Sequence, residues 1–384
     1  MLAVAPDCDG LMIACYSPFL YIAHGQSMPH YRLVEQPDLL APQLADQHRL
    51  GIDTEFMREK TYFAQLCLVQ IATSNDIYCV DPLTDSGTDE FWRQLLATKW
   101  VVHSARQDIE VVSQTAGAMP SSIFDTQVAA GLLGYPAQMG YAGLVKELFD
   151  VDMDKSHTRA DWSRRPLRDV FLDYAAEDVE HLLPAFELLS ERLEKQGRLA
   201  WAHEDSQLLL DPQLYDLGAA QALDRLKGAR NFRGQKRAAA ARLSAWRERE
   251  AIARNRPRQW ILRDSVLLDI AYQLPGSMQQ LADIEGMPAK VLNRVGEDLL
   301  QELAAAANDE NNYSPPRPPD EAQKELLKEM QSRVVKCAKE LGIAAETVAS
   351  KRELSAVIIS GSRESRVFSG WRRDIIGSEL LALM

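Results

Sequence analysis

The sequence predicts an α/β domain built on a mixed sheet, followed by two all-helical domains. Three observations support this prediction. Strand-like runs alternate with helical patterns over roughly the first 200 residues, as is typical of α/β domains. Strand signals then vanish, while helical patterns rich in Ala, Leu, Arg and Glu continue. A proline-rich stretch divides this helical part in two.

The first domain is expected at residues 28–205. Its predicted strands cover residues 48–54, 62–73, 76–80 and 100–103, and its helical patterns cover 90–97, 107–115, 144–149 and a long stretch from 167 to 195. Residues 1–27 precede the first stretch that reads as ordinary domain sequence. We expect them to be an N-terminal extension, either disordered or the result of a misassigned start.

The helical part divides into three expected segments. Residues 206–307 form a helical domain with a leading basic segment, residues 308–320 form a proline-rich linker, and residues 321–384 form a second helical domain. The linker contains four prolines, which favour an extended chain.

The net charge of −12 argues against a nucleic-acid partner, but the distribution of charge matters more than the sum. Residues 225–263 contain thirteen Lys or Arg against two Glu, Glu248 and Glu250. An acidic chain with one basic segment suits an enzyme that holds a polyanion in one place and cations in another.

The five cysteines show no CxxC spacing, so neither a disulfide framework nor a zinc site is predicted. No apolar run approaches the roughly 18 residues of a membrane span, and no basic start marks a signal peptide. We therefore expect a cytoplasmic protein with no membrane association and no obligate protein partner.

Acidic residues supply the candidate chemistry. Asp53 and Glu55 alternate on a predicted strand, so both side chains point to one face, with Ile52 and Thr54 on the other. A cation bound by both acids would relieve their repulsion, although the pair on its own also fits a solvated strand face.

Two further elements add acids to this pair. Asp108 opens a helix directly after a strand, where it either serves a site at the sheet edge or favours the positive end of its helix. Tyr174 and Asp178 lie four residues apart on a predicted helix, and so on one face of it. On its own, this pair is also explained by a core tyrosine with a surface aspartate one turn away on the same helix.

Together these elements resemble the DEDD superfamily of 3′→5′ exonucleases, in its tyrosine-bearing branch. The surrounding sequence resembles the ribonuclease D family over about residues 28 to 384. The matching stretches are Leu50 to Phe56, Asp81-Pro82-Leu83, His103 to Asp108, Asp125-Thr126-Gln127, Asp161-Trp162 and Arg165-Pro166-Leu167.

The resemblance implies a ribonuclease H-like exonuclease domain that binds two divalent metal ions, Mg²⁺ or Mn²⁺. It implies that Asp53, Glu55 and Asp178 hold one ion, and that Asp53 bridges to a second ion which Asp108 approaches. Hard carboxylate oxygens suit both metals. Tyr174 matches the residue that orients the attacking water, and a phenol with an ordinary pKa near 10 suits orientation better than base catalysis.

Four residues are candidate substrate contacts. Phe56 follows the two acids and either stacks on the terminal base or packs in the core. Lys155 and Arg165 either contact phosphate or are solvated loop charges, as is also true of Arg168. His103 either touches substrate or is structural.

Residues 236–305 contain the stretches Leu243 to Arg247, Ile261 to Asp264 and Ile284 to Gly286, with which they resemble an HRDC domain. The C-terminal region, with Ser369 to Arg373, resembles a second HRDC-like unit. The resemblance implies a module that binds nucleic acid through phosphates, with a spacer role as the alternative. The leading hypothesis is a 3′→5′ exoribonuclease that releases 5′-mononucleotides and trims RNA, with tRNA precursors carrying 3′ trailers as substrates. The alternatives are a DNA 3′→5′ exonuclease and a non-catalytic nucleic-acid-binding scaffold.

Overall fold

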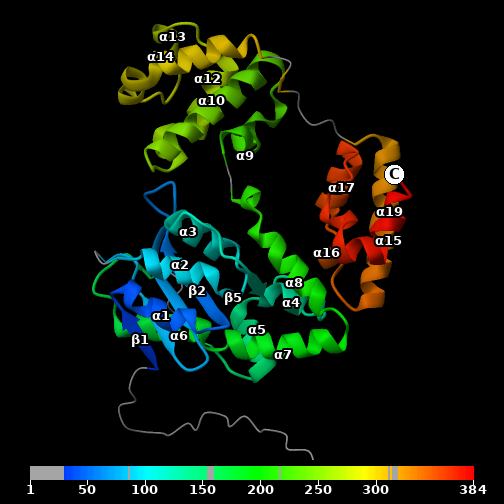
Figure 1. The fold of residues 1–384 in the computed structure, drawn as a ribbon. Helices are drawn as coiled ribbons and strands as arrows, with labels where there is room; N and C mark the ends of the chain where they lie inside the picture. Colours follow the sequence, from blue (N-terminus) through cyan, green and yellow to red (C-terminus); the bar gives the residue numbers. More distant parts are fainter. Residues whose placement is uncertain (1–29, 85–86, 154–159, 216–217, 310–311, 314–318) are drawn as a thin grey trace, which may run out of the picture.

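The computed structural model describes residues 30–84, 87–153, 160–215, 218–309, 312–313 and 319–384. The expected extension at residues 1–27 and the candidate contact Lys155 lie outside these ranges. The described chain forms an α/β domain followed by two helical domains, so the predicted fold class is confirmed (Figure 1). None of the described helices is long and apolar enough to cross a bilayer.

The α/β domain contains a six-stranded mixed sheet with the order β1-β4-β3-β2-β5-β6. Its strands are β1 (Tyr31–Val34), β2 (Arg49–Met57), β3 (Gln65–Ala72), β4 (Ile77–Val80), β5 (Lys99–Val102) and β6 (Ile123–Asp125). The β2–β3 and β3–β4 pairs are antiparallel, and the other three pairs are parallel. The central strand β3 is buried on both faces, which explains its almost continuous apolar sequence.

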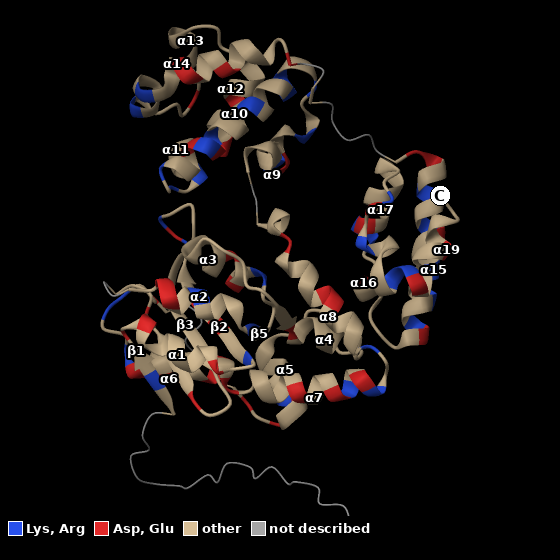
Figure 2. Cartoon of the chain, viewed as in Figure 1, with Lys and Arg blue, Asp and Glu red and all other residues tan. Residues whose placement is uncertain are grey.

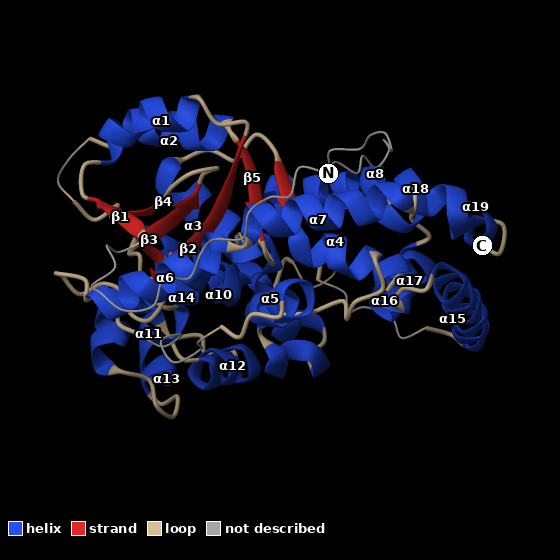
Figure 3. Ribbon diagram, turned by 90° about the horizontal axis from the view of Figure 1, so that it is seen from below, coloured by secondary structure: helices blue, strands red, loops and turns tan. Residues whose placement is uncertain are grey.

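Helices cover both faces of the sheet. They are α1 (Ala41–Ala45), α2 (Asp89–Ala97), α3 (Arg106–Ala116), α4 (Thr126–Leu132), α5 (Tyr141–Phe149), α6 (Asp169–Glu180), α7 (Leu182–Lys195) and α8 (Leu199–Gln207), with short 3₁₀ turns η1 (Pro37–Leu40), η2 (Leu208–Leu210) and η3 (Pro212–Leu214). Figure 3 shows α1 and α2 on one face and α6 on the other. The core of the first face also takes side chains from α3, and the second face packs against α6 and the start of α7.

Several elements of this domain were not predicted from the sequence. They are the short strands β1 and β6 and the helices α1, α4 and α8. The single helix expected from 167 to 195 is two helices, because the chain breaks at His181, between the end of α6 and the start of α7. The break follows Asp178 by less than one turn. Asp178 therefore lies in the last turn of α6.

The first helical domain follows. It contains η4 (Ala219–Gln221), α9 (Ala222–Arg225), η5 (Lys227–Asn231), α10 (Gly234–Ala253), α11 (Arg258–Ile261), α12 (Asp264–Gln273), α13 (Met278–Ala282) and α14 (Ala289–Ala306). It docks on the loop that follows β2. The hydroxyl of Tyr62 donates to Glu248, and the backbone N–H groups of Tyr62 and Phe63 donate to Asn255 Oδ1 at 3.0 Å. A cavity of about 530 Å³ lies between this loop and the helices.

The basic segment at residues 225–263 is largely neutralised inside this domain. Six of its arginines form ion pairs with acids: Arg225, Arg242, Arg247, Arg249, Arg254 and Arg258. A seventh, Arg237, is buried and donates to the carbonyls of Ala229 and Tyr313. Basic and acidic segments accordingly lie beside each other in this domain (Figure 2). Most of the charge counted from the sequence therefore holds the domain together.

The expected linker at residues 308–320 begins as part of the helical domain. Asp309 pairs with Arg242, and the carbonyl of Tyr313 accepts from Arg237. The linker ends where Asp320 caps α15 in a reciprocal capping box with Gln323.

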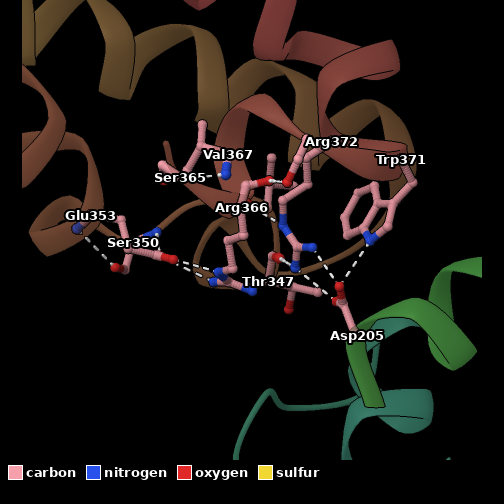
Figure 4. Close-up of polar contacts among 11 residues, drawn as sticks. Asp205, Thr347, Ser350, Glu353, Ser365, Arg366, Val367, Trp371 and Arg372 are labelled. Atoms are coloured by element: carbon pink, nitrogen blue, oxygen red, sulfur yellow. Dashed lines mark hydrogen bonds and ion pairs between the residues drawn. The ribbon is translucent and has the colours of Figure 1, made fainter. Parts of the chain in front are cut away.

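The C-terminal domain contains α15 (Glu321–Leu341), α16 (Ala345–Val348), α17 (Lys351–Ser360), η6 (Arg366–Phe368), α18 (Gly370–Arg372), η7 (Arg373–Gly377) and α19 (Ser378–Leu381). It docks on α8 of the α/β domain through a buried ion pair (Figure 4). The two terminal nitrogens of Arg372 donate to the two oxygens of Asp205 at 2.5 and 2.7 Å, and Trp371 Nε1 donates to the same carboxylate at 3.0 Å. Trp371 also stacks on Trp201.

Candidate active site

Three of the predicted acids come together beneath α6. Asp53 and Glu55 project from β2 towards α6, and Asp178 projects from the last turn of that helix. One carboxylate oxygen from each lies within 4.8 Å of the other two. Gly51 shows how close the helices approach this strand, because a Cβ at Gly51 would meet Leu182 at 3.2 Å. The small residue therefore lets the helical acid reach the strand acids.

Burial disfavours the charged form of all three carboxyls. Burial, reinforced by the neighbouring carboxylates, raises the pKa of Asp53 well above its ordinary value. The same causes raise the pKa of Glu55 to about 8, and burial raises the pKa of Asp178 to about 7. No basic group is among the causes that shift these three pKa values. Such an oxygen-only set matches the ligands that Mg²⁺ and Mn²⁺ prefer, so the residues fit a divalent ion.

The fourth predicted acid, Asp108, lies beside the trio but outside it. It is buried in the first turn of α3, and its charge is the largest carboxylate contribution to the raised pKa of Asp53. Thr54 Oγ1 donates to Asp108 Oδ1 at 2.6 Å. The sequence reading placed Thr54 on the opposite strand face from the acids, and the structure shows that from there its hydroxyl orients the fourth acid.

The loop before α3 is held by a further acid. Asp125 accepts from the backbone N–H groups of Ser104 and Ala105 at 3.1 and 2.9 Å, and it also caps α4. Ser104 has a φ of 61°, which a non-glycine residue adopts only when its surroundings enforce it. Asp125 thereby fixes the start of the helix that carries Asp108.

Tyr174 lies one turn before Asp178 on α6, as the spacing predicts. Its hydroxyl is hydrogen-bonded to the Asp178 carboxylate. Burial and the neighbouring Asp178, Glu55 and Asp53 carboxylates raise the pKa of Tyr174 above its ordinary value. The phenol is therefore neutral near pH 7 and can donate or accept a hydrogen bond at the edge of the trio.

The described candidate substrate contacts mostly bind or pack against other parts of the protein. Arg165 is committed elsewhere, because its Nε and both terminal nitrogens donate to Asp81, to Trp162 and Arg164 carbonyls and to the Cys67 carbonyl. These bonds use all five N–H donors of a guanidinium, so none remains for a phosphate. Arg165 therefore has a structural role in this structure, and its contact with phosphate stays a prediction.

Phe56 and His103 also serve the fold. Phe56 is partly buried and packs against the core on the α3 face. The ring nitrogens of His103 lie 2.9 Å from Thr126 Oγ1 and from the carbonyl of Met139, and burial lowers its pKa. Of the residues considered beside them, Arg168 stays exposed at the start of α6, with its guanidinium over the Phe171 ring.

The sequence analysis assigned no supporting role to Thr54 or Asp125, and it did not single out Gln70. Gln70 lies directly opposite Asp53 in the β2–β3 pair and is fully buried. The sequence offered a signal only for Asp125, because Asp followed by Thr and Gln is typical of a helix N-cap. Contacts between residues of different elements, such as Thr54 of β2 and Asp108 of α3, leave no local pattern in the sequence.

Comparison with known proteins identifies the family of the chain. Residues 33–194 match the family model of a 3′–5′ exonuclease, and residues 236–303 match that of the HRDC domain. The chain is 37% identical to ribonuclease D of Gluconacetobacter diazotrophicus over 349 residues, which covers 87% of both chains. It is 34% identical to ribonuclease D of Pseudomonas paraeruginosa, over 92% of this chain and 97% of the relative.

A solved structure gives the same result. The crystal structure of Escherichia coli RNase D, described as an exoribonuclease involved in structured RNA processing, superposes with a TM-score of 0.83 at 25% identity. The match covers 92% of this chain and 98% of the bacterial enzyme. Sequence and fold therefore agree over nearly the whole length, and the chain belongs to the ribonuclease D family.

Proposed function

We propose that this protein, a 3′→5′ exoribonuclease by family, hydrolyses RNA with two divalent metal ions and trims the 3′ trailers of tRNA precursors. The observation that carries the chemistry is the carboxylate trio of Asp53, Glu55 and Asp178. Its oxygens lie close enough to share a cation, and the trio draws on two separate elements, β2 and α6. If Asp53 and Glu55 only formed a solvated strand face, no third acid from a helix would be expected beside them. Asp178 of α6 therefore favours a metal site over that alternative.

The residues divide the work of hydrolysis among them. Two divalent ions, Mg²⁺ or Mn²⁺, would lower the pKa of the attacking water and stabilise the leaving 3′ oxygen. Asp53, Glu55 and Asp178 would hold the first ion, and Asp53 and Asp108 would hold the second. Thr54 orients Asp108. Tyr174, neutral and beside Asp178, is placed to orient the water by a hydrogen bond. The products are 5′-mononucleotides.

Two further points support the proposed setting. The E. coli relative is described as acting on structured RNA, which favours tRNA precursors over unstructured substrates. The described cysteines Cys67, Cys79 and Cys337 are free thiols, which suits the reducing cytoplasm.

The first experiment uses a 5′-labelled RNA hairpin with an unstructured 3′ tail. Wild-type protein, Asp53→Ala and Asp173→Asn are each incubated with Mg²⁺, Mn²⁺ or EDTA. Asp173 is an exposed acid of α6 outside the trio, so its variant is the matched control. We expect wild type and control to produce a ladder that shortens from the 3′ end only with metal, and Asp53→Ala to leave the RNA intact. Metal-independent cleavage, or a ladder from Asp53→Ala, would contradict the proposed site.

Substrate choice needs its own comparison. Matched RNA and DNA oligonucleotides test the sugar, because only RNA offers a 2′-hydroxyl to the protein. A tRNA precursor with a 3′ trailer then tests the proposed substrate, with the mature tRNA as reference. Equal rates on RNA and DNA would favour the DNA exonuclease, and tight RNA binding without turnover would favour the scaffold.

A further inference from the structure

Gln70 is a buried side chain for which the structure supplies no partner. It is 0% exposed on the central strand β3, and neither its Oε1 nor its Nε2 has a hydrogen-bond partner among the described residues. Buried amides are almost always hydrogen-bonded, because an unpaired one loses its contacts with water and gains nothing in return. An orphan amide in a strand that is buried on both faces therefore calls for an explanation.

The register of the sheet places Gln70 beside the candidate metal site. Gln70 pairs directly with Asp53 in the antiparallel β2–β3 ladder. Residues opposite each other in such a ladder point to the same face, with Cβ atoms about 4.5–5.5 Å apart. The reach of a glutamine side chain covers that separation.

The packing of its neighbours confirms which face this is. Leu68 and Ala72, two residues to either side of Gln70, pack with side chains of α6 and the start of α7. Val69 and Ile71 pack in the core on the opposite face. Gln70 thus lies on the face of the sheet that also carries Asp53 and that α6 covers.

Resting on the proposed function, we propose that Gln70 is a positioning residue for Asp53. Its amide N–H donates to the Asp53 carboxylate when the acids hold their cations. Cations draw the ionised acids into one geometry, and the amide then supplies the bond that fixes the orientation of Asp53.

This role predicts opposite effects on stability and on metal binding. Replacing Gln70 with an apolar side chain of similar size removes the orphan amide, so the metal-free protein becomes more stable. The same change removes the group that orients Asp53, so the affinity for metal falls. Loss of a group that orients a metal ligand typically weakens metal binding about 10- to 100-fold. A glutamine that only filled space would show neither the gain nor the loss.

The test measures Mn²⁺ binding by calorimetry and the melting temperature in EDTA, for the full chain. The variants are Gln70→Met and Gln70→Leu, which both lack the amide but differ in shape. Ser190→Ala is the matched control, because Ser190 Oγ on α7 is also buried and has no hydrogen-bond partner within the described part of the chain. We expect all three variants to melt higher than wild type in EDTA, because each removes a buried polar group without a partner among the described residues. Only the two Gln70 variants should bind Mn²⁺ about 10- to 100-fold more weakly.

The outcomes separate this inference from the proposed function. Wild-type Mn²⁺ affinity in both Gln70 variants overturns the positioning role and leaves the metal site intact. Weakened binding in Ser190→Ala as well, or a lower melting temperature in both Gln70 variants, assigns Gln70 a packing role and also overturns it. If wild type binds no Mn²⁺ at all, the proposed metal site itself fails, and the role of Gln70 fails with it.

Discussion

At the scale of single residues, the site is a set of acids held by neutral groups. Thr54, Tyr174 and Gln70 surround Asp53, Glu55, Asp178 and Asp108, and none of the three carries a charge. Neutral hydrogen-bond donors can orient a carboxylate without competing with a cation for its charge. A lysine or arginine in the same place would form an ion pair with the acids and weaken their hold on the metal.

The raised carboxyl pKa values predict how the stability of the protein depends on pH. Folding raises the pKa of Asp108 and Asp178 to about 7 and that of Glu55 to about 8, from about 4 in an unfolded chain. The metal-free folded state thus binds protons more tightly than the unfolded state. These protonated carboxyls contribute stability that is fully present below about pH 4. That contribution is lost as the pH rises through the folded pKa values of about 7 to 8.

Divalent metal should reverse this decline, because it replaces the protons. We expect Mg²⁺ to raise the melting temperature about twice as much or more at pH 8 as at pH 6. Asp53→Asn should remove the metal effect and melt higher than wild type in EDTA at pH 8. Differential scanning calorimetry at the two pH values checks this, and an equal response to Mg²⁺ at both would contradict it.

Thr54 offers a second residue-scale prediction. Thr54→Val keeps the shape and removes the hydroxyl that donates to Asp108. A hydrogen bond to a charged group contributes about 1.5–3 kcal/mol, so we expect RNA cleavage to slow by about 10- to 150-fold and the Mg²⁺ requirement to rise. Thr54→Ser, which keeps the hydroxyl, should restore the rate. Equal rates for the Val and Ser variants would show that the bond is unimportant.

At the scale of elements, the first helical domain has one concentrated group of unpaired cations. Of the thirteen basic residues, Lys227, Arg230, Arg233 and Lys236 lie at η5 and the start of α10 and form no ion pair among the described residues. Lys227 and Arg230 are three residues apart on a 3₁₀ turn, so they point the same way. Lys236 Nζ lies 3.4 Å from the ring centroid of Tyr272, which is 57% exposed.

Cations beside an exposed aromatic ring are typical of surfaces that hold nucleic acid. We expect Lys227→Gln with Arg230→Gln to weaken binding of a long RNA and to lower the slope of log Kd against log salt by about 1.5. Cleavage of a dinucleotide, which is too short to reach this domain, should not change. Lys290→Gln with Arg294→Gln, two exposed cations at the start of α14, is the matched control. Equal weakening by both pairs would indicate a general charge effect.

At the scale of the whole molecule, two quite different contacts hold the helical domains to the α/β domain. The first domain docks by hydrogen bonds to the loop after β2, the strand that carries Asp53 and Glu55. The second docks by the buried pair of Asp205 and Arg372. Because a buried charge without its partner is costly, the second contact is the more sensitive to a single substitution.

Asp205→Asn should therefore release the C-terminal domain. Arg372 is 1% exposed and would be left as a buried charge without an ionised partner, at a cost of about 3–5 kcal/mol. We expect faster proteolysis within residues 308–320 and a red-shifted tryptophan emission as Trp201 and Trp371 separate. The exposed neighbouring Arg373→Gln variant serves as the control. A proteolysis rate like that of wild type would show that other contacts suffice for docking.

The sequence by itself determined the fold class, the five residues proposed for catalysis and the helical nature of the C-terminal half. These features depend on local periodicity and on residue spacing within one element, such as Asp53 and Glu55 on a strand or Tyr174 and Asp178 on a helix. A resemblance of the whole chain to one family then ordered the separate acids into a single site.

Only the tertiary structure decided which polar groups face one another. It showed that the N–H groups of Arg165 donate to Asp81 and to backbone carbonyls, and that the hydroxyl of Thr54 donates to Asp108. It also showed that about half of the cations in the basic segment form ion pairs within their own domain. It also broke the long predicted helix at His181. The physical reason is the same in each case. Hydrogen bonds and ion pairs form between groups that folding brings together. The sequence between two such groups shows no pattern that predicts their contact.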